Sequence, residues 1–272
     1  EQEAYNEALA YAKERAQFGQ KIINFPAVYD MLSRMKAKLD AGRSLLYQTA
    51  RYVDIYKALE DIQRDAKLTA EERDELKKYT RLADAFTPLA KGMNSEYASQ
   101  AAYDAISIHG GSGFIMEYKS QRLYRDARIF SIYEGTTQLQ VVAAIRYITN
   151  GTYLGIIREM LGNEVAESLK PLQTRVAKLA EQYEEVLNEV KEEGNQEKQD
   201  FVARRLFNMT ADIIMSLLIL DDATRSPELF VKSANVFVRH AEEEVTGHYA
   251  YIKNLCAEDL VNFRAAEVET AE

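Results

Sequence analysis

One carboxylate in this sequence stands where acid–base chemistry would be expected. Glu134 lies directly before Gly135 and two threonines, and four of the 12 glycines fall between residues 110 and 135. Glycine marks places where a backbone turns sharply or approaches another body closely. A threonine hydroxyl accepts a hydrogen bond from the first turn of a helix. The pattern therefore predicts a reactive carboxylate on a loop that opens a helix.

Several sequence motifs accompany that carboxylate. IHGGSGF occupies residues 108–114, YRDAR residues 124–128 and IYEGTTQLQ residues 132–140, while YAKERAQFG stands near the N-terminus at residues 11–19. In this order the motifs resemble those of the C-terminal helical domain of the acyl-CoA dehydrogenases. Members of that family use FAD to form a double bond between Cα and Cβ of acyl-CoA thioesters. The resemblance covers roughly residues 1–150.

The resemblance implies that Glu134 is the base that removes the α-proton of the thioester, after which the β-hydrogen leaves as hydride to the flavin. Desolvation disfavours the charged carboxylate, so dry surroundings would strengthen this base. In the family, the backbone N–H of the glutamate and a flavin hydroxyl hold the thioester oxygen. Gly135 would leave room for the acyl chain and Tyr133 would line its pocket. The plainer alternatives are helix capping for Glu134 and a core position for Tyr133.

The N-terminal motif supplies Arg15, Gln17 and Phe18, which match the family's Arg-x-x-Phe-Gly element. In a relative this arginine reaches the FAD pyrophosphate of a neighbouring subunit, and a guanidinium fork suits two phosphates. The match therefore implies a homodimer or a dimer of dimers. The alternative for Arg15 is a surface ion pair with Glu14 or Glu7.

Two further pairs of residues match flavin contacts of the family. Gly110 and Gly111 match a turn that lies on the adenosine part of the neighbour's FAD. Thr136 and Gln138 match positions that touch FAD, where a hydroxyl and an amide suit ribityl or adenosine oxygens. The alternatives for Thr136 and Gln138 are a helix cap and a solvated helix face.

The sequence departs from the family at Ser107 and Pro26, where glutamine is usual, and both changes bear on the adenosine contacts. His109 is expected to pack or to form a hydrogen bond rather than to act as an acid or base. His240 and His248 are eight residues apart, a wider spacing than metal ligation favours, so no metal is expected. A charged cluster is interpreted as an ion-pair network that holds its loop: Arg122, Arg125, Asp126 and Arg128.

The spacing of apolar residues predicts an all-α protein without strands: an up-and-down four-helix bundle followed by a second, smaller helical bundle. The first bundle is assigned to residues 1–152 and the appended domain to residues 153–272. Pro88 is expected to kink its helix. The four main helices of the first bundle are predicted at 2–17, 28–59, 69–105 and 136–148, with a short one at 118–127. A link at 152–162 leads to helices at 164–192, 197–222, 226–255 and 257–270.

Composition narrows the function further. The net charge of −9 argues against a nucleic-acid partner. The single cysteine excludes an intrachain disulfide and fits a reducing compartment, so a cytoplasmic location is expected. No run of about 18 uncharged apolar residues is present, so no transmembrane segment is expected.

The sequence begins at Glu1 rather than methionine and enters a helix at once, which together with the resemblance indicates a piece of a longer protein. By itself this piece is expected neither to hold FAD tightly nor to turn over. The family implies acyl-CoA as the substrate and an electron-transfer flavoprotein as the electron acceptor. The alternatives are an acyl-CoA oxidase, which passes electrons to oxygen, and a non-catalytic helical assembly module.

Overall fold

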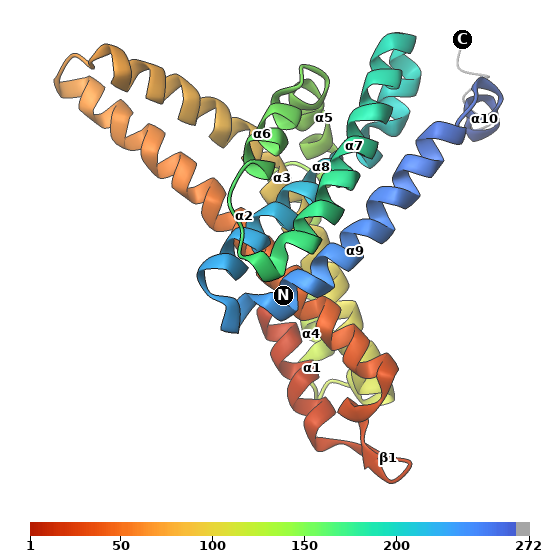
Figure 1. Cartoon of the computed structure of the whole chain (residues 1–272). Coiled ribbons are helices and arrows are strands. Elements are labelled where there is room, and N and C mark those ends of the chain that lie inside the picture. The colour runs from red at the N-terminus through yellow and green to blue at the C-terminus, as the bar shows by residue number, and fades with distance from the viewer. Residues whose placement is uncertain (265–272) are drawn as a thin grey trace.

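The computed structural model describes residues 1–264, most of which lie in ten helices (Figure 1). The first six helices are α1 (Gln2–Glu14), α2 (Pro26–Asp65), α3 (Ala70–His109), α4 (Ser120–Ala127), α5 (Thr137–Thr149) and α6 (Thr152–Leu161). The other four are α7 (Lys170–Glu193), α8 (Gln196–Arg225), α9 (Pro227–Asn254) and α10 (Ala257–Phe263). The all-α prediction is therefore confirmed. The last residues of the predicted 257–270 helix lie outside the described range.

Local sequence signals set where several helices begin. Pro26 stands in the first turn of α2, where its missing N–H costs no helical hydrogen bond. Thr69 caps α3 by accepting from the N–H of Glu72 at 3.2 Å, and its own N–H donates to the Glu72 carboxylate at 2.7 Å. The chain continues as α3 through Pro88 as far as His109.

Two segments differ from the sequence-based expectation. Residues 15–21 form a small antiparallel hairpin of β1 (Ala16–Gln17) and β2 (Gln20–Lys21), where no strand was expected. Phe18 and Gly19 at its tip both have positive φ, at 49° and 82°, as the two central residues of a type I′ hairpin turn require. Residues 152–161 form α6 rather than a link, because buried Tyr153 and Ile157 anchor that segment in the core despite Gly155.

The appended helices pack directly on the first bundle. α8 lies at the centre, buried along residues 209–220, and it contacts α2, α5, α7 and α9. One hydrophobic cluster includes residues from α2, α3 and α5 through to α9, so both parts of the chain share it. A second cluster joins α1 to the start of α2 and the end of α3. In Figure 1 the far ends of α2 and α3 extend from this body as a paired arm, while the hairpin lies at the opposite tip. Within residues 1–264 no helix has the length and apolar character needed to cross a membrane.

Candidate active site

Glu134 lies in a turn between a short 3-10 helix (Arg128–Ser131) and α5, with an unusual backbone conformation. Its φ is +51°, and the φ of Gly135 is +90°. Among the non-glycine residues of the described range, only Phe18 also has a positive φ. A left-handed conformation is costly for a residue with a Cβ and persists only where its surroundings impose it. The backbone of Glu134 thus has a conformation that an unconstrained loop would avoid.

Contacts from α3 and α5 hold the residues that follow Glu134. The Nζ of Lys91 donates to the carbonyl oxygen of Gly135 at 2.6 Å, and the side-chain amide of Gln140 donates to the same oxygen at 3.3 Å. The hydroxyl of Thr137 donates to Glu96 at 2.6 Å. Sequence reasoning missed Lys91, because 44 residues separate it from Gly135 and no spacing rule links them.

Thr136 is the N-cap of α5, where its hydroxyl accepts a hydrogen bond from the N–H of Leu139 at 3.3 Å. The capping alternative for Thr136 is therefore realised, and its hydroxyl hydrogen stays available for a ligand. Gln138 lies exposed in the first turn of α5, so its flavin contact stays a prediction. Glu134 lies two residues before this N-cap, on the side of α5 where the helix dipole is positive.

The glutamate turn is open to solvent in this chain. Glu134 is exposed and Tyr133 retains 46% of its accessible surface, so the core alternative for Tyr133 is wrong. Apolar side chains around the turn are also exposed, among them Ile132 and Leu139. The described residues therefore do not themselves supply the dry surroundings that a strong carboxylate base needs.

The two other motifs meet at the far end of α3. The ring of Tyr11 stacks on His109 with the ring centroids 4.3 Å apart, and its hydroxyl lies 3.4 Å from that of Ser112. His109 is buried, with Nδ1 2.7 Å from the carbonyl oxygen of Ala105, which confirms it as a packing residue. The N-terminal motif and the glycine turn thus form one surface, which we call the hairpin cluster (residues 11–19 and 109–114).

The residues of the hairpin cluster that match flavin contacts face outward. Arg15 and Gln17 are exposed, and Phe18 keeps 93% of its accessible surface. Arg15 makes no ion pair with any residue of the range 1–264, so the surface-pair alternative is wrong. Gly110 ends α3 with φ at +62°, and a Cβ at Gly111 would meet nothing within 4 Å. A ligand could therefore approach this surface directly.

The charged residues in and after α4 do not form the expected ion-pair network within residues 1–264. Within residues 1–264 the four residues form no ion pair, and Arg128 Nη1 instead donates to the hydroxyl of Ser131 at 2.5 Å. The network that was expected comprised Arg122, Arg125, Asp126 and Arg128. Nδ1 of His240 and Nε2 of His248 each lie 4.0 Å from a carboxylate oxygen of Glu244.

The structure separates the predicted site residues into two groups. The glutamate turn (residues 133–138) is fastened to α3 at Lys91, whereas the hairpin cluster includes Gly110 just beyond the end of α3. Nineteen residues of helix intervene, which at about 1.5 Å per residue is roughly 28 Å. A single small ligand does not span that distance.

Two protein-family models match this sequence. The model described as the C-terminal domain of acyl-CoA dehydrogenase matches residues 2–148. A second model, described as acyl-CoA dehydrogenase C terminal, matches residues 149–260. This chain belongs to the acyl-CoA dehydrogenase family.

Curated relatives match the first half of the chain. The caffeyl-CoA reductase–Etf complex subunit CarC of Acetobacterium woodii is 39% identical over 139 residues, which is 51% of this chain and 30% of the relative. The 3-methylmercaptopropionyl-CoA dehydrogenase of Ruegeria pomeroyi is 38% identical over 146 residues, which is 50% of this chain and 23% of the relative. The chain therefore spans less than a third of the length of these curated relatives.

Solved structures match the fold of nearly the whole chain. An acyl-CoA dehydrogenase of Bacillus anthracis complexed with FAD has a TM-score of 0.69 at 23% identity, covering 95% of this chain and 47% of that one. ACDH-11 of Caenorhabditis elegans, in complex with C11-CoA, also has a TM-score of 0.69, at 21% identity, and covers 97% of this chain and 45% of that one. At these identities the likeness concerns the fold alone.

Proposed function

We propose that this chain is the C-terminal part of an FAD-dependent acyl-CoA dehydrogenase in which Glu134 removes the α-proton of an acyl-CoA thioester. The observation that supports this most is the left-handed backbone of Glu134, maintained by Lys91 and Gln140 through the carbonyl of Gly135. A purely structural turn would place glycine or asparagine at such a position at lower cost. Retaining glutamate there fits a requirement for its carboxylate.

The proposed chemistry uses three groups of this turn. The carboxylate of Glu134 takes the α-proton, and the apolar side chains around it would desolvate it once a substrate and further protein cover the turn. The backbone N–H of Glu134 has no acceptor within residues 1–264, so it is open to donate to the thioester oxygen as the enolate develops. Gly135 leaves space for the acyl chain and Tyr133 would line it. FAD, when bound, would accept the β-hydrogen as hydride.

The positions of the residues that match flavin contacts fit an FAD that is bound between two subunits. Arg15 presents an exposed guanidinium without an ion-pair partner in the described range, which suits a pyrophosphate. Gly110 and Gly111 leave an open surface for the adenosine part of the same flavin. Thr136 and Gln138 lie roughly 28 Å away along α3, so they would contact a different FAD molecule. This separation supports a homodimer, or a dimer of dimers, in which each flavin is shared by two subunits.

The remaining assignments follow from the same proposal. We place the boundary between the catalytic bundle and the appended domain at residue 152, close to the junction of the two family matches. We expect an electron-transfer flavoprotein to accept the electrons, since one relative is named as a subunit of an Etf complex. A cytoplasmic location remains part of the proposal. The 272-residue chain alone is expected to purify without FAD, and stoichiometric flavin absorbance in it would contradict that expectation.

The test is Glu134→Gln in the complete protein that contains this chain. Because general-base catalysis contributes typically about 10²- to 10⁴-fold, flavin reduction by acyl-CoA should slow by about that factor. Flavin content and thermal unfolding should not change, since the amide keeps the shape of the side chain. Glu117→Gln, at an exposed glutamate of the loop before α4, is the matched control. Unchanged flavin reduction in Glu134→Gln would remove this residue as the base, and rapid hydrogen peroxide formation in the parent protein would favour the oxidase.

A further inference from the structure

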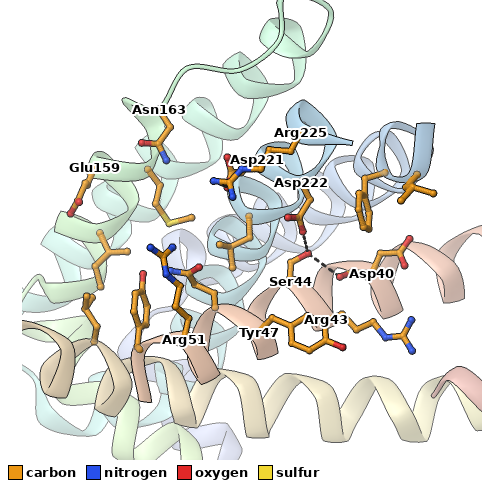
Figure 2. A pocket seen from close by; sticks show the side chains of 18 of the residues that line it. Asp40, Arg43, Ser44, Tyr47, Arg51, Glu159, Asn163, Asp221, Asp222 and Arg225 are labelled. Atoms are coloured by element: carbon orange, nitrogen blue, oxygen red, sulfur yellow. Dashed lines mark hydrogen bonds and ion pairs between the residues drawn. The ribbon is translucent and has the colours of Figure 1, made fainter. Parts of the chain in front are cut away.

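A cavity with no part in the proposed reaction lies where α2, α3, α6, α8 and α9 converge (Figure 2). Its volume is about 940 Å³, which falls within the range of about 300–1,000 Å³ typical of small-molecule sites. None of the residues that line it is among those predicted to contact FAD or the thioester. It therefore needs an explanation of its own.

One wall of this cavity is apolar and rigid. The ring of Tyr52 packs against Tyr79 with the centroids 6.0 Å apart and edge-on against buried Phe86 at 5.0 Å, so the wall is anchored in the core. Met160 and Leu218 continue the apolar lining from α6 and α8. Such a wall suits the apolar or aromatic body of a ligand.

Positive groups gather at one end. Figure 2 shows Arg51 reaching up from α2 and Arg225 reaching in from α8, on the side of the cavity where Glu159 and Asn163 also lie. Arg225 pairs with Asp221 at 2.8 Å, whereas Arg51 makes no ion pair within residues 1–264. Lys78 lines the same cavity without such a pair and lies over the ring of Tyr79 at 5.9 Å. Arg51 is therefore a cation of this end without an acidic partner in the described range.

Two acids at the opposite end are already hydrogen-bonded. Asp40 is buried and accepts hydrogen bonds from Lys36 and Ser233, both at 2.5 Å. Asp222 accepts from the hydroxyl of Ser44. Arg43 points away from the Arg51 end, as Figure 2 shows. Glu228 also lines the cavity, in the first turn of α9, where the helix dipole stabilises its charge. A ligand's charged group is therefore better received at the Arg51 end.

We propose that this cavity binds an amphipathic monocarboxylate, with its carboxylate between Arg51 and Arg225 and its apolar body along Tyr52, Met160 and Leu218. Guanidinium groups bind carboxylates through two parallel hydrogen bonds. A single negative charge would pair with Arg51, whose guanidinium has no acidic partner within residues 1–264. A nucleotide with several phosphates would be poorly matched to Asp221 and Glu159, which line the same end.

Calorimetric titration of the intact 272-residue chain tests the ligand class. The probes are decanoate, decyl phosphate and decyltrimethylammonium, which share one tail and differ in the head group, each below its micelle concentration. Decanoate should bind saturably at one site and decyltrimethylammonium should not. The proposal fails if decanoate shows no saturable binding, or if decyl phosphate binds more tightly than decanoate.

Variants of α2 test the position of the carboxylate. Arg51→Gln should weaken decanoate binding about tenfold or more, because a hydrogen bond to a charged group is lost. Arg64→Gln on the same helix removes only an exposed pair with Asp61 and should leave binding unchanged. Arg51→Glu should abolish decanoate binding and admit decyltrimethylammonium, which a merely unfolded protein would not do. Wild-type affinity in Arg51→Gln, or an equal loss in Arg64→Gln, would overturn the assignment.

Discussion

Two carboxylates of this chain are unusual for opposite reasons. Asp212 lies in the middle of α8 with 2% of its surface exposed and accepts a hydrogen bond from the hydroxyl of Tyr97 at 3.1 Å. Burial, with the charge of Glu244, raises its pKa to about 7. Glu134 is exposed, and what sets it apart is its left-handed backbone.

Asp212 and Glu134 thus differ in which property is unusual, the pKa in one and the backbone conformation in the other. Burial gives Asp212 a shifted pKa, yet the core of α8 keeps it from any substrate as large as a thioester. Glu134 has access to a ligand, and its backbone is fixed by contacts from α3 and α5. A shifted pKa alone is therefore a weaker sign of catalysis here than a constrained, accessible position. The following predictions test that distinction, beginning with the largest effect.

The first prediction concerns packing near each carboxylate. Ile213→Ala, beside Asp212 in the core of α8, should lower the free energy of unfolding by about 2–5 kcal/mol, because it leaves a cavity in a fully buried site. Leu139→Ala, near Glu134 and exposed, should change it by less than about 0.5 kcal/mol. Urea unfolding of both variants measures the difference. Similar losses in the two would mean that the glutamate turn is part of the stabilising core.

The second prediction concerns the pH dependence of stability. Asp212 has a folded-state pKa near 7 against an ordinary value of 3.8, so between these values the folded state keeps a proton that the unfolded chain has released. Its contribution therefore makes stability fall as pH rises from about 4 to 7, by up to about 1.4 kcal/mol for each unit of pKa difference. Asp212→Asn should remove that contribution. As the pH rises from about 4 to 7, the free energy of unfolding of the variant should therefore increase relative to that of the wild type.

The comparison with the wild type is needed because two histidines act in the other direction. Burial lowers the pKa of His240 to about 3 and that of His248 to about 4. Both stay neutral in the folded state while the unfolded chain binds protons below 6.5, so they make stability fall as pH falls. Unfolding curves of the wild type and Asp212→Asn at several pH values separate the effects. A constant difference between the two proteins from pH about 4 to 7 would show that Asp212 is not protonated in the folded state.

The third prediction concerns the backbone beside Glu134. Gly135→Ala places a Cβ at a residue whose φ is +90°, and that Cβ would lie 3.0 Å from the amide of Gln140. The expected loss of stability is about 1–2 kcal/mol, and flavin reduction in the complete protein should fall as the turn shifts. Gly155→Ala in α6, where a Cβ meets nothing, should instead stabilise by about 0.5–1 kcal/mol. Unchanged flavin reduction in Gly135→Ala would show that the turn need not be held.

The parts of the fold that depend on neighbouring residues could be predicted from the sequence. The helix starts predicted at residues 28 and 69 lie within two residues of the observed starts at Pro26 and Ala70, because the signals for a helix start act within one turn. The positive φ of Glu134 could not be predicted, since glutamate has no preference for it and the contact of Lys91 with the next residue comes from α3. Helix α6 was missed for a similar reason, because burial of its apolar residues outweighs the effect of Gly155.

The last and smallest prediction compares two helix caps. Thr69 and Thr136 both cap helices through their hydroxyls, so Thr69→Ala and Thr136→Ala should each lower the free energy of unfolding by about 1 kcal/mol. If Thr136 also contacts FAD, only Thr136→Ala should weaken flavin retention in the complete protein, measured by the absorbance of bound flavin after dialysis. Thr69 lies at the start of α3, in the paired arm, and serves as the matched control. Equal flavin retention in both variants would leave Thr136 as a cap and would remove it from the flavin site, without affecting the role proposed for Glu134.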